Sequence, residues 1–213
     1  MSKIKIFTLA IIVLSFATGF YFYPKMPEVM ASHWNLNNAV NGYLPKFWGL
    51  FLMPVISLVL YGFSLVIPKI DPLKDNIKKF SKYFEGFILL LFLFLFYIYC
   101  LTIAWNLGFH FLMGSALAPA LAGLFYACGV LIENAQPNWS IGIRTPWTLS
   151  NETVWKKTHQ VGGKAFKIAA IVSLAGLIFP SLAYLFVLIP ILFASFYVIL
   201  YSYLEFHRLQ KHS

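Results

Sequence analysis

Charged residues are scarce in this chain. Asp, Glu, Lys and Arg make up 11% of its 213 residues, and hydrophobic residues make up 60%. A soluble domain usually carries about 25% charged and about 45–50% apolar residues. A soluble globule of this size has too little interior to bury so much apolar surface. The composition therefore excludes an ordinary soluble fold and indicates a protein that lies in a lipid bilayer.

The sequence is also poor in cysteine and in motifs for chemistry. Its two cysteines, Cys100 and Cys128, both fall inside apolar runs. They give neither a disulfide framework nor the ligand spacing of a zinc site. The chain lacks HExxH and GxSxG motifs, and it has no aspartate pair deep within an apolar run. We therefore predict no catalytic residues, no metal site and no cofactor, and an enzyme is the least favoured class.

Six apolar stretches are long enough to cross a hydrocarbon layer of roughly 30 Å as helices. The predicted spans are Ile4–Tyr23, Phe47–Ile67, Phe84–Trp105, Phe109–Ile132 and two helices within Lys164–Leu204 that turn at Pro180-Ser181. The first stretch has an alternative interpretation as a cleaved signal peptide, but its apolar run continues past Ala17-Thr18-Gly19, which favours an uncleaved anchor. The predicted fold is an all-α, multi-pass protein of the cell membrane with six transmembrane helices.

Lysine and arginine are distributed unevenly between the two ends of these spans. With the N-terminus inside, 14 of the 16 basic residues fall in inner segments, and only Lys25 and Lys46 fall outside. Such an imbalance orients helices with their basic loops in the cytoplasm. We therefore predict that both termini are cytoplasmic. The basic residues behind the formal net charge of +9 lie in short loops between apolar runs, where they would orient helices, so direct nucleic-acid binding is not expected.

The predicted outer loop, Pro24–Lys46, contains three prolines and an Asn41-Gly42 pair, which favour turns over a long helix. The loop exceeds a minimal connection, so we expect it to fold back onto the membrane surface. His33 is a candidate metal ligand. However, only His110 accompanies it on the outer side, and an ordinary surface histidine is the better interpretation.

The inner loop between the fourth and fifth spans is expected to contain a short helix. Ser150 is a good N-cap residue, so the helix should begin at Asn151. Trp155 and His159 would then lie four residues apart on one face. Gly162-Gly163 would follow, either as a flexible point or as a close helix contact before the fifth span.

Arg144 and Trp147 flank a fixed turn just before this helix, because Pro146 forces Thr145 toward extended backbone. One interpretation is that Arg144 and Trp147 anchor the loop at the lipid headgroups. The other is that they form a recognition surface, which would use the planar, bidentate guanidinium that lysine cannot replace. These residues by themselves leave both interpretations open.

The segment GIRTPWTLSNETVWKKTH, followed by GG, closely resembles the signature of the SdpI family of bacterial membrane proteins, which is named for a toxin-immunity protein. The outer loop, with YP…MP, HWN and NGY…K, looks like a second conserved domain that is often found N-terminal to it. Asn38 stands where that pattern commonly has Gly, and Asn41 stands where Asp is common.

The resemblance implies candidate binding residues in both loops. In the inner motif these are Arg144, Thr145, Pro146, Trp147, Trp155, Thr158 and His159. In the outer loop they are His33, Asn35, Gly42 and Lys46. It also implies a two-helix unit with the outer loop at residues 1–68, and an SdpI-like four-helix unit at 69–213 that contains the inner loop, 133–164.

The function that the resemblance implies is protection of the producing cell against a secreted, membrane-disrupting peptide toxin. In the founding system the immunity protein also binds a small helix-turn-helix repressor at the membrane and keeps it from DNA. A small transporter or exporter is the alternative, although the spans offer only scattered polar residues for a path. The expected partners are the lipid bilayer, a peptide toxin at the outer face or in the membrane, and a repressor at the inner loop.

Overall fold

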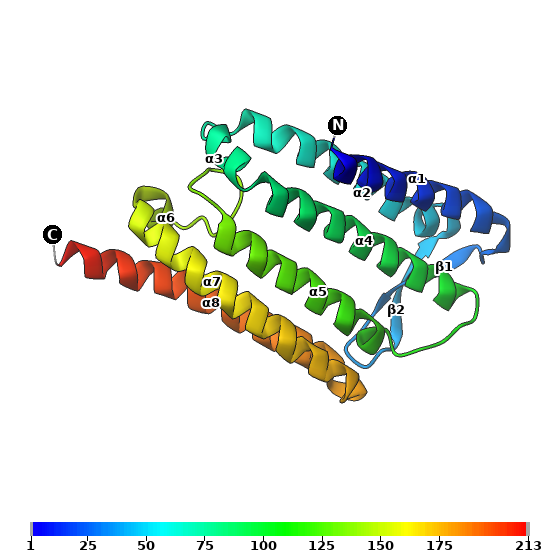
Figure 1. Cartoon of the computed structure of the whole chain (residues 1–213). Helices are drawn as coiled ribbons and strands as arrows, with labels where there is room; N and C mark the ends of the chain where they lie inside the picture. The colour runs from blue at the N-terminus through cyan, green and yellow to red at the C-terminus, as the bar shows by residue number, and fades with distance from the viewer. Residues whose placement is uncertain (1, 212–213) are drawn as a thin grey trace.

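A computed structural model of the chain describes residues 2–211, and within them six helices are long and apolar enough to cross a membrane (Figure 1). These are α1 (Lys3–Phe22), α2 (Lys46–Ile70), α4 (Ser81–Asn106), α5 (Met113–Asn134), α7 (Glu152–Ser173) and α8 (Ala183–Gln210). The shorter elements are η1 (Tyr23–Lys25), β1 (Val29–Trp34), β2 (Val40–Pro45), α3 (Lys74–Lys79), α6 (Pro146–Ser150), η2 (Leu174–Leu177) and η3 (Pro180–Leu182).

The prediction of six spanning helices is confirmed, and each predicted span overlaps one of them. The fourth begins at Met113 rather than Phe109, because Gly108 takes a positive φ of 96° and the four residues after it form an irregular connection. The predicted reversal at Pro180-Ser181 is also confirmed, since η2 and η3 turn the chain between α7 and α8.

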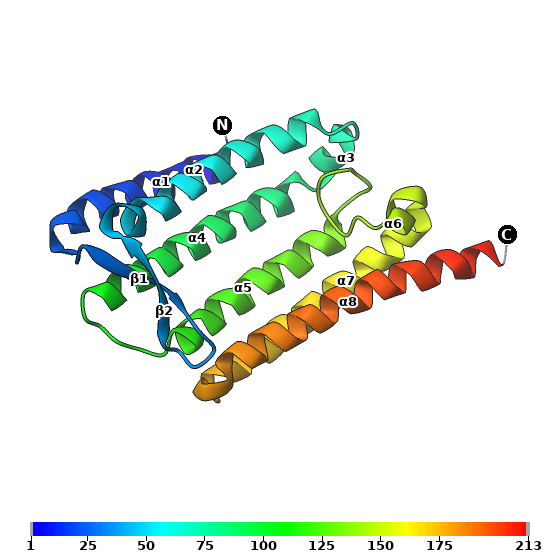
Figure 2. The same ribbon diagram turned by 180° about the vertical axis from the view of Figure 1, so that it is seen from behind.

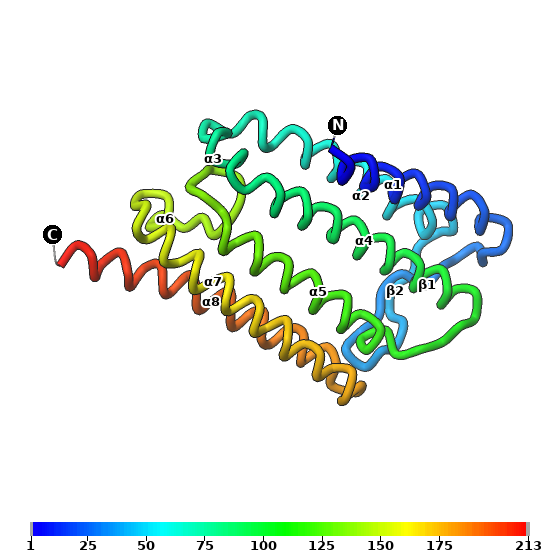
Figure 3. Tube along the Cα trace, in the orientation of Figure 1, coloured from blue at the N-terminus to red at the C-terminus, as the bar shows by residue number. Residues whose placement is uncertain are grey.

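The long helices lie side by side in a broad layer. α1 and α2 lie along one edge, α4 and α5 cross the middle, and α7 and α8 pair along the other edge (Figures 1 and 2). The β-strands and the α4–α5 connection lie at one end of this layer, whereas α3, α6 and the C-terminus lie at the other (Figure 3). The loops that the charge distribution predicts to be outer and inner therefore lie at opposite ends.

The outer loop folds into a β-hairpin, which the sequence analysis did not predict. β1 pairs antiparallel with β2, and its register is irregular around His33. At the turn, the Asn35 side-chain oxygen accepts hydrogen bonds from the backbone N–H groups of Asn37 and Ala39. The expected turns are present, but six-residue strands with a bulge carry too short an alternation of apolar and polar residues to be recognised from sequence.

The predicted N-cap of the inner helix is wrong by one residue. Ser150 is the last residue of α6, and its hydroxyl donates to the Trp147 carbonyl oxygen. Asn151 is the N-cap of α7, and its side-chain oxygen accepts from the N–H groups of Thr153 and Val154. Asparagine and serine are about equally good caps, so the sequence did not distinguish them.

Gly162 and Gly163 form a close helix contact rather than a flexible point. A Cβ on Gly163 would lie 2.7 Å from the carbonyl oxygen of Gly129 on α5. Small residues permit this approach of helix backbones in a membrane. α7 consequently runs unbroken from Glu152 to Ser173, so the helix expected from Asn151 and the fifth span are one helix. The short helix that precedes it is α6.

Buried side chains form three clusters along the layer. The first joins the hairpin to α2 and α4, the second joins α1, α2 and α4, and the third fastens α3 and the inner loop to α5 and α7. The third cluster positions the candidate site, and it consists of Ile77, Phe80, Leu131, Ala135, Ile141 and Trp155.

Candidate functional site

The inner loop is organised around His159, of which 1% is exposed. Its Nε2 accepts a hydrogen bond from the backbone N–H of Ile143 at 3.0 Å, and its Nδ1 lies 2.8 Å from the carbonyl oxygen of Trp155. A nitrogen that accepts a hydrogen bond carries no proton, so the geometry assigns the proton to Nδ1 and makes the ring neutral. Both ring nitrogens are therefore used to hold backbone.

Trp155 fastens the other end of the same loop. Its ring stacks on His159 with 3.9 Å between the ring centroids, which confirms that the two residues share a face of the helix. Its Nε1–H donates to the carbonyl oxygen of Ala135 at 3.0 Å. Trp155 and His159 thus attach both Ala135 and Ile143 to α7, and the intervening loop is closed between them.

Gly142 is required by this arrangement, and the sequence analysis did not single it out. Its φ is 118°, a conformation that L residues with a side chain rarely adopt. A Cβ at this position would lie 2.4 Å from Nε2 of His159. The signal available in the sequence was its place as the first residue of the motif, two positions before Arg144.

The turn into α6 is held by hydroxyl groups. Thr145 has the extended backbone predicted from Pro146, with φ −94° and ψ 161°. Its Oγ1 accepts from the N–H of Thr148 and donates to Oγ of Ser202 on α8 at 3.0 Å. Thr158 is fully buried, and its Oγ1 has no hydrogen-bond partner among the described residues.

Of the seven inner residues predicted to bind, Arg144 and Pro146 are exposed and Trp147 is half-buried. Nη1 of Arg144 donates to the carbonyl oxygen of Trp139 at 2.8 Å. Trp147 packs edge-to-face on Tyr203 of α8, with 5.2 Å between the ring centroids. The predicted motif residues therefore separate into a buried group that shapes the loop and a surface group that the loop presents.

The α2–α4 connection supplies two residues that the sequence analysis missed. Asp71 is 3% exposed, and its carboxylate accepts from the N–H of Trp139 and the hydroxyl of Ser140. Asn76 donates to the carbonyl oxygen of Pro137 at 2.9 Å. The Asp71-Pro72 pair directly after a span is a turn signal that could have identified this support.

Two ion pairs join α7 to its neighbours. Lys167 pairs with Glu133 of α5, and Lys157 pairs with Glu205 of α8 at 2.6 Å. The charge analysis placed both lysines in inner segments, and the structure places both within α7. Each pair lies toward the end of the layer that carries the inner loop.

The four predicted outer residues all belong to the hairpin region. Nδ1 of His33 lies 2.6 Å from the side-chain oxygen of Asn41, the position where the resembling pattern commonly has Asp. Gly42 lies opposite His33, and a Cβ on Gly42 would lie 2.8 Å from the His33 Cβ. Asn35 forms the turn, and Lys46 pairs with Glu28 at 2.6 Å.

Two asparagines attach the hairpin to the helices. Asn38 has a φ of 60°, which asparagine tolerates and glycine adopts freely, so either residue suits this position. Its side-chain oxygen accepts from the N–H of Gly114 at the start of α5, at 2.8 Å. Asn106 at the end of α4 bonds both the N–H and the carbonyl oxygen of Ala31. Among residues 2–211, no group of three His, Cys, Asp or Glu side chains is placed to hold a metal ion.

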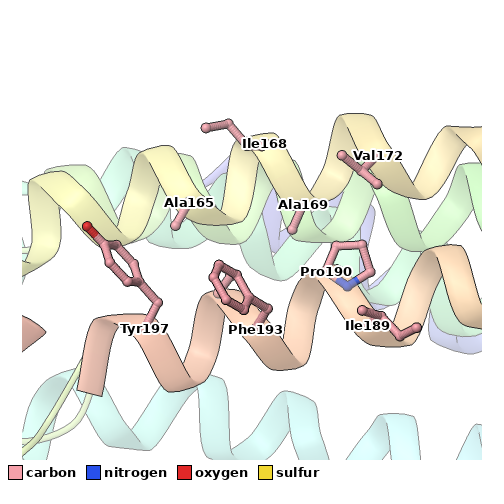
Figure 4. Close-up of a pocket in the computed structure, with 9 residues that line it drawn as sticks. Ala165, Ile168, Ala169, Val172, Ile189, Pro190, Phe193 and Tyr197 are labelled. Atoms are coloured by element: carbon pink, nitrogen blue, oxygen red, sulfur yellow. The ribbon is translucent and has the colours of Figure 1, made fainter. Parts of the chain in front are cut away.

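Two apolar grooves open along the helices. One lies between α7 and α8, has a volume of about 460 Å³, and is bordered by Ala165, Ala169 and Phe193 (Figure 4). The other, of about 470 Å³, lies between α2, α4 and α5. The inner end of this second groove is formed by residues 140–143 of the inner loop. None of the described residues that line the groove is charged.

Two regions of the chain match known protein families. Residues 134–202 match the SdpI/YfhL protein family, and residues 10–58 match a domain of unknown function, DUF1648. The chain is 25% identical over 171 residues to Immunity protein SdpI of Bacillus subtilis (strain 168), which covers 80% of this chain and 79% of that protein. No solved structure matches it. Residues 134–202 therefore form an SdpI/YfhL-like region, and residues 10–58 form a DUF1648 region toward the N-terminus.

Proposed function

We propose that this protein is a membrane immunity protein, which protects the cell that makes it from a membrane-active peptide toxin. The observation that carries the proposal is its similarity to Immunity protein SdpI, because that similarity extends over 80% of the chain rather than over one motif. A shared fold alone would not support a shared function.

The inner motif supports a binding role rather than catalysis. A general base needs a free nitrogen within reach of a substrate proton. Both nitrogens of His159 are engaged with backbone groups, and the Trp155 N–H is engaged in the same way. The motif uses these polar groups to hold one loop shape, and it presents Arg144 and Trp147 at its surface.

Arg144 is the residue through which an inner partner would be recognised. Among the described residues its guanidinium bonds to the Trp139 carbonyl alone, which leaves other N–H groups available for a carboxylate. Trp139, whose carbonyl oxygen accepts that bond, is itself 56% exposed, so the loop also offers an aromatic side chain to a partner. Aromatic residues and arginine dominate the binding energy of many protein interfaces. In this proposal a small repressor protein, as in the founding system, binds here.

The toxin binds through an apolar segment in the groove between α2, α4 and α5. The uncharged lining suits a segment that is itself dissolved in the membrane. Because residues 140–143 close the inner end of the groove, an occupant would touch the same loop that His159 holds. Occupancy of the groove and the shape of the inner loop are thereby connected.

Protection is measured as growth of a toxin-sensitive bacterial host that produces the full chain and is exposed to a membrane-active toxin of a related immunity system. In Cys128→Leu a larger side chain fills part of the α2–α4–α5 groove. Ala165→Leu fills part of the α7–α8 groove in the same way and is the matched control. We expect Cys128→Leu to lose protection and Ala165→Leu to keep it. The membrane level of each variant is measured, because overpacking can lower stability by about 1–3 kcal/mol.

Each result has a distinct consequence. If both groove variants protect equally at equal abundance, the toxin does not bind in the α2–α4–α5 groove. If Arg144→Lys protects and signals as the parent does, Arg144 is an anchor and not a recognition residue, because lysine keeps the charge and loses only the planar fork. If the parent chain gives no protection against any related toxin, the immunity function is refuted.

A further inference from the structure

The connection between α2 and α4 carries a dense set of cations at its surface. Five lysines lie within residues 69–82, and all five are exposed: Lys69, Lys74, Lys78, Lys79 and Lys82. The two acidic residues of this segment offset little of that charge. Asp71 is buried and bonded to the inner loop, and Asp75 pairs with Lys78 at 2.7 Å. The Lys78 ammonium lowers the pKa of Asp75, so Asp75 remains ionised and neutralises one lysine.

The geometry keeps these lysines close to the membrane. α2 ends at Ile70 and α4 begins at Ser81, so residues 71–80 must leave one spanning helix and enter the next. Ile77 and Phe80 are buried against the bundle, which leaves the lysines of α3 on its outward face. Such a short connection cannot carry its side chains far from the lipid surface.

Apolar side chains are exposed beside the lysines. Ile70 is 70% exposed and Leu73 is 41% exposed. Exposed aliphatic groups next to cations are typical of segments that lie in the interface, with the aliphatic groups in the acyl boundary and the cations among the headgroups. A partner in aqueous solution would leave Ile70 and Leu73 unexplained, whereas a lipid surface accounts for both.

The connection is also held in place rather than loose. The Asp71 carboxylate accepts from the N–H groups of Leu73 and Trp139, and Asn76 donates to Pro137. Nζ of Lys79 donates to the side-chain oxygen of Asn76 at 2.9 Å. The lysines therefore project from a backbone that is fixed to the inner loop, and ordering them on a headgroup layer costs less entropy than ordering a flexible tail.

We propose that residues 69–82 form a binding surface for anionic phospholipid headgroups of the adjacent leaflet, with Ile70 and Leu73 inserted at the acyl boundary. Charge complementarity and the position of the connection both select lipid as the partner. This surface does not depend on the immunity function, and it would exist in a member of the family with a different activity.

The test compares phosphatidylglycerol with phosphatidylcholine on the purified full chain in a neutral detergent. Native mass spectrometry gives the apparent Kd of each lipid. The test variant replaces Lys74, Lys78, Lys79 and Lys82 by Gln. The control variant replaces Lys3, Lys156, Lys164 and Lys211 by Gln, which removes the same charge from exposed positions outside the connection.

We expect phosphatidylglycerol to bind the parent and the control variant with similar Kd, and to bind the test variant at least tenfold more weakly. This is a cautious value, because one lysine near an anionic surface contributes about a fivefold change in affinity. The preference over phosphatidylcholine should fall as salt is raised. Equal weakening in both variants would show a general effect of net charge and would overturn the proposal, as would unchanged binding to the test variant.

Two further measurements keep the result interpretable. Soluble glycerol phosphate replaces the lipid at the same headgroup concentration, and equally tight binding of this probe would show a free-phosphate site instead of a lipid surface. If the test variant has a lower melting temperature than the parent in phosphatidylcholine, a double variant with Lys74→Gln and Lys82→Gln replaces it. This double variant leaves the Lys78–Asp75 pair and the Lys79–Asn76 bond intact. A reduction of less than threefold in that double variant would equally refute the proposal.

Discussion

Gly142→Ala is expected to release the inner loop from His159. At a φ of 118°, a side chain costs about 1–2 kcal/mol in backbone strain. The new Cβ, 2.4 Å from Nε2 of His159, must also displace the ring and break its bond to the N–H of Ile143. Leaving a buried donor and acceptor unpaired costs about 1–3 kcal/mol. The free energy of unfolding should therefore fall by about 2–5 kcal/mol.

Gly108→Ala provides the matched control. Gly108 also has a positive φ, 96°, but beyond its two chain neighbours no described atom lies within 4 Å of where its Cβ would be. Alanine there should cost the backbone strain alone, about 1–2 kcal/mol. The difference between the two variants isolates the collision with His159.

Both variants can be compared by denaturant unfolding of the purified protein in a mild detergent, followed by far-ultraviolet circular dichroism. Gly142→Ala should unfold at a clearly lower denaturant concentration than Gly108→Ala. If the two midpoints coincide, the His159–Ile143 bond does not hold the loop as described, and the buried motif residues have some other role.

Three further predictions concern the two ends of the molecule. Trp155→Phe keeps the ring stack but leaves the Ala135 carbonyl unpaired, so the free energy of unfolding in detergent should fall by about 1–3 kcal/mol. An unchanged midpoint would show that this bond does not stabilise the protein. Asn38→Ala should destabilise the protein more than Asn38→Gly in the same assay, because glycine keeps the positive φ while both lose the bond to α5; the reverse order would contradict this. A cysteine at Asn37 should react with an impermeant reagent in intact cells and one at Lys156 should not, and labelling of both would refute the topology.

Much of the fold could be predicted because lipid imposes simple rules. About twenty apolar residues make a span, and basic residues mark the inner side, so the number and order of the six helices follow from composition along the chain. The pairing of Trp155 with His159 could also be predicted, since residues four apart share a helix face.

Contacts between distant segments could not be predicted in this way. The bond between Asp71 and Trp139 joins residues 68 positions apart, and nothing local to either residue indicates the other. The hairpin was missed for a related reason, because its strands are short and are held partly by Asn106, which belongs to α4. The unbroken course of α7 depends on Gly129 of another helix, which turns the Gly162-Gly163 pair from a break into a contact.

The burial of the motif changes how substitutions in it should be interpreted. Thr145, Trp155, Thr158 and His159 are interior residues, so replacing them tests the shape of the loop before it tests any partner. A loss of activity in those variants follows from misfolding as readily as from lost recognition. Arg144 is different, because it is exposed and lysine can still donate one hydrogen bond to the Trp139 carbonyl. Arg144→Lys therefore changes the recognition chemistry while leaving the loop closed, and it is the substitution in this motif whose phenotype reports on a partner.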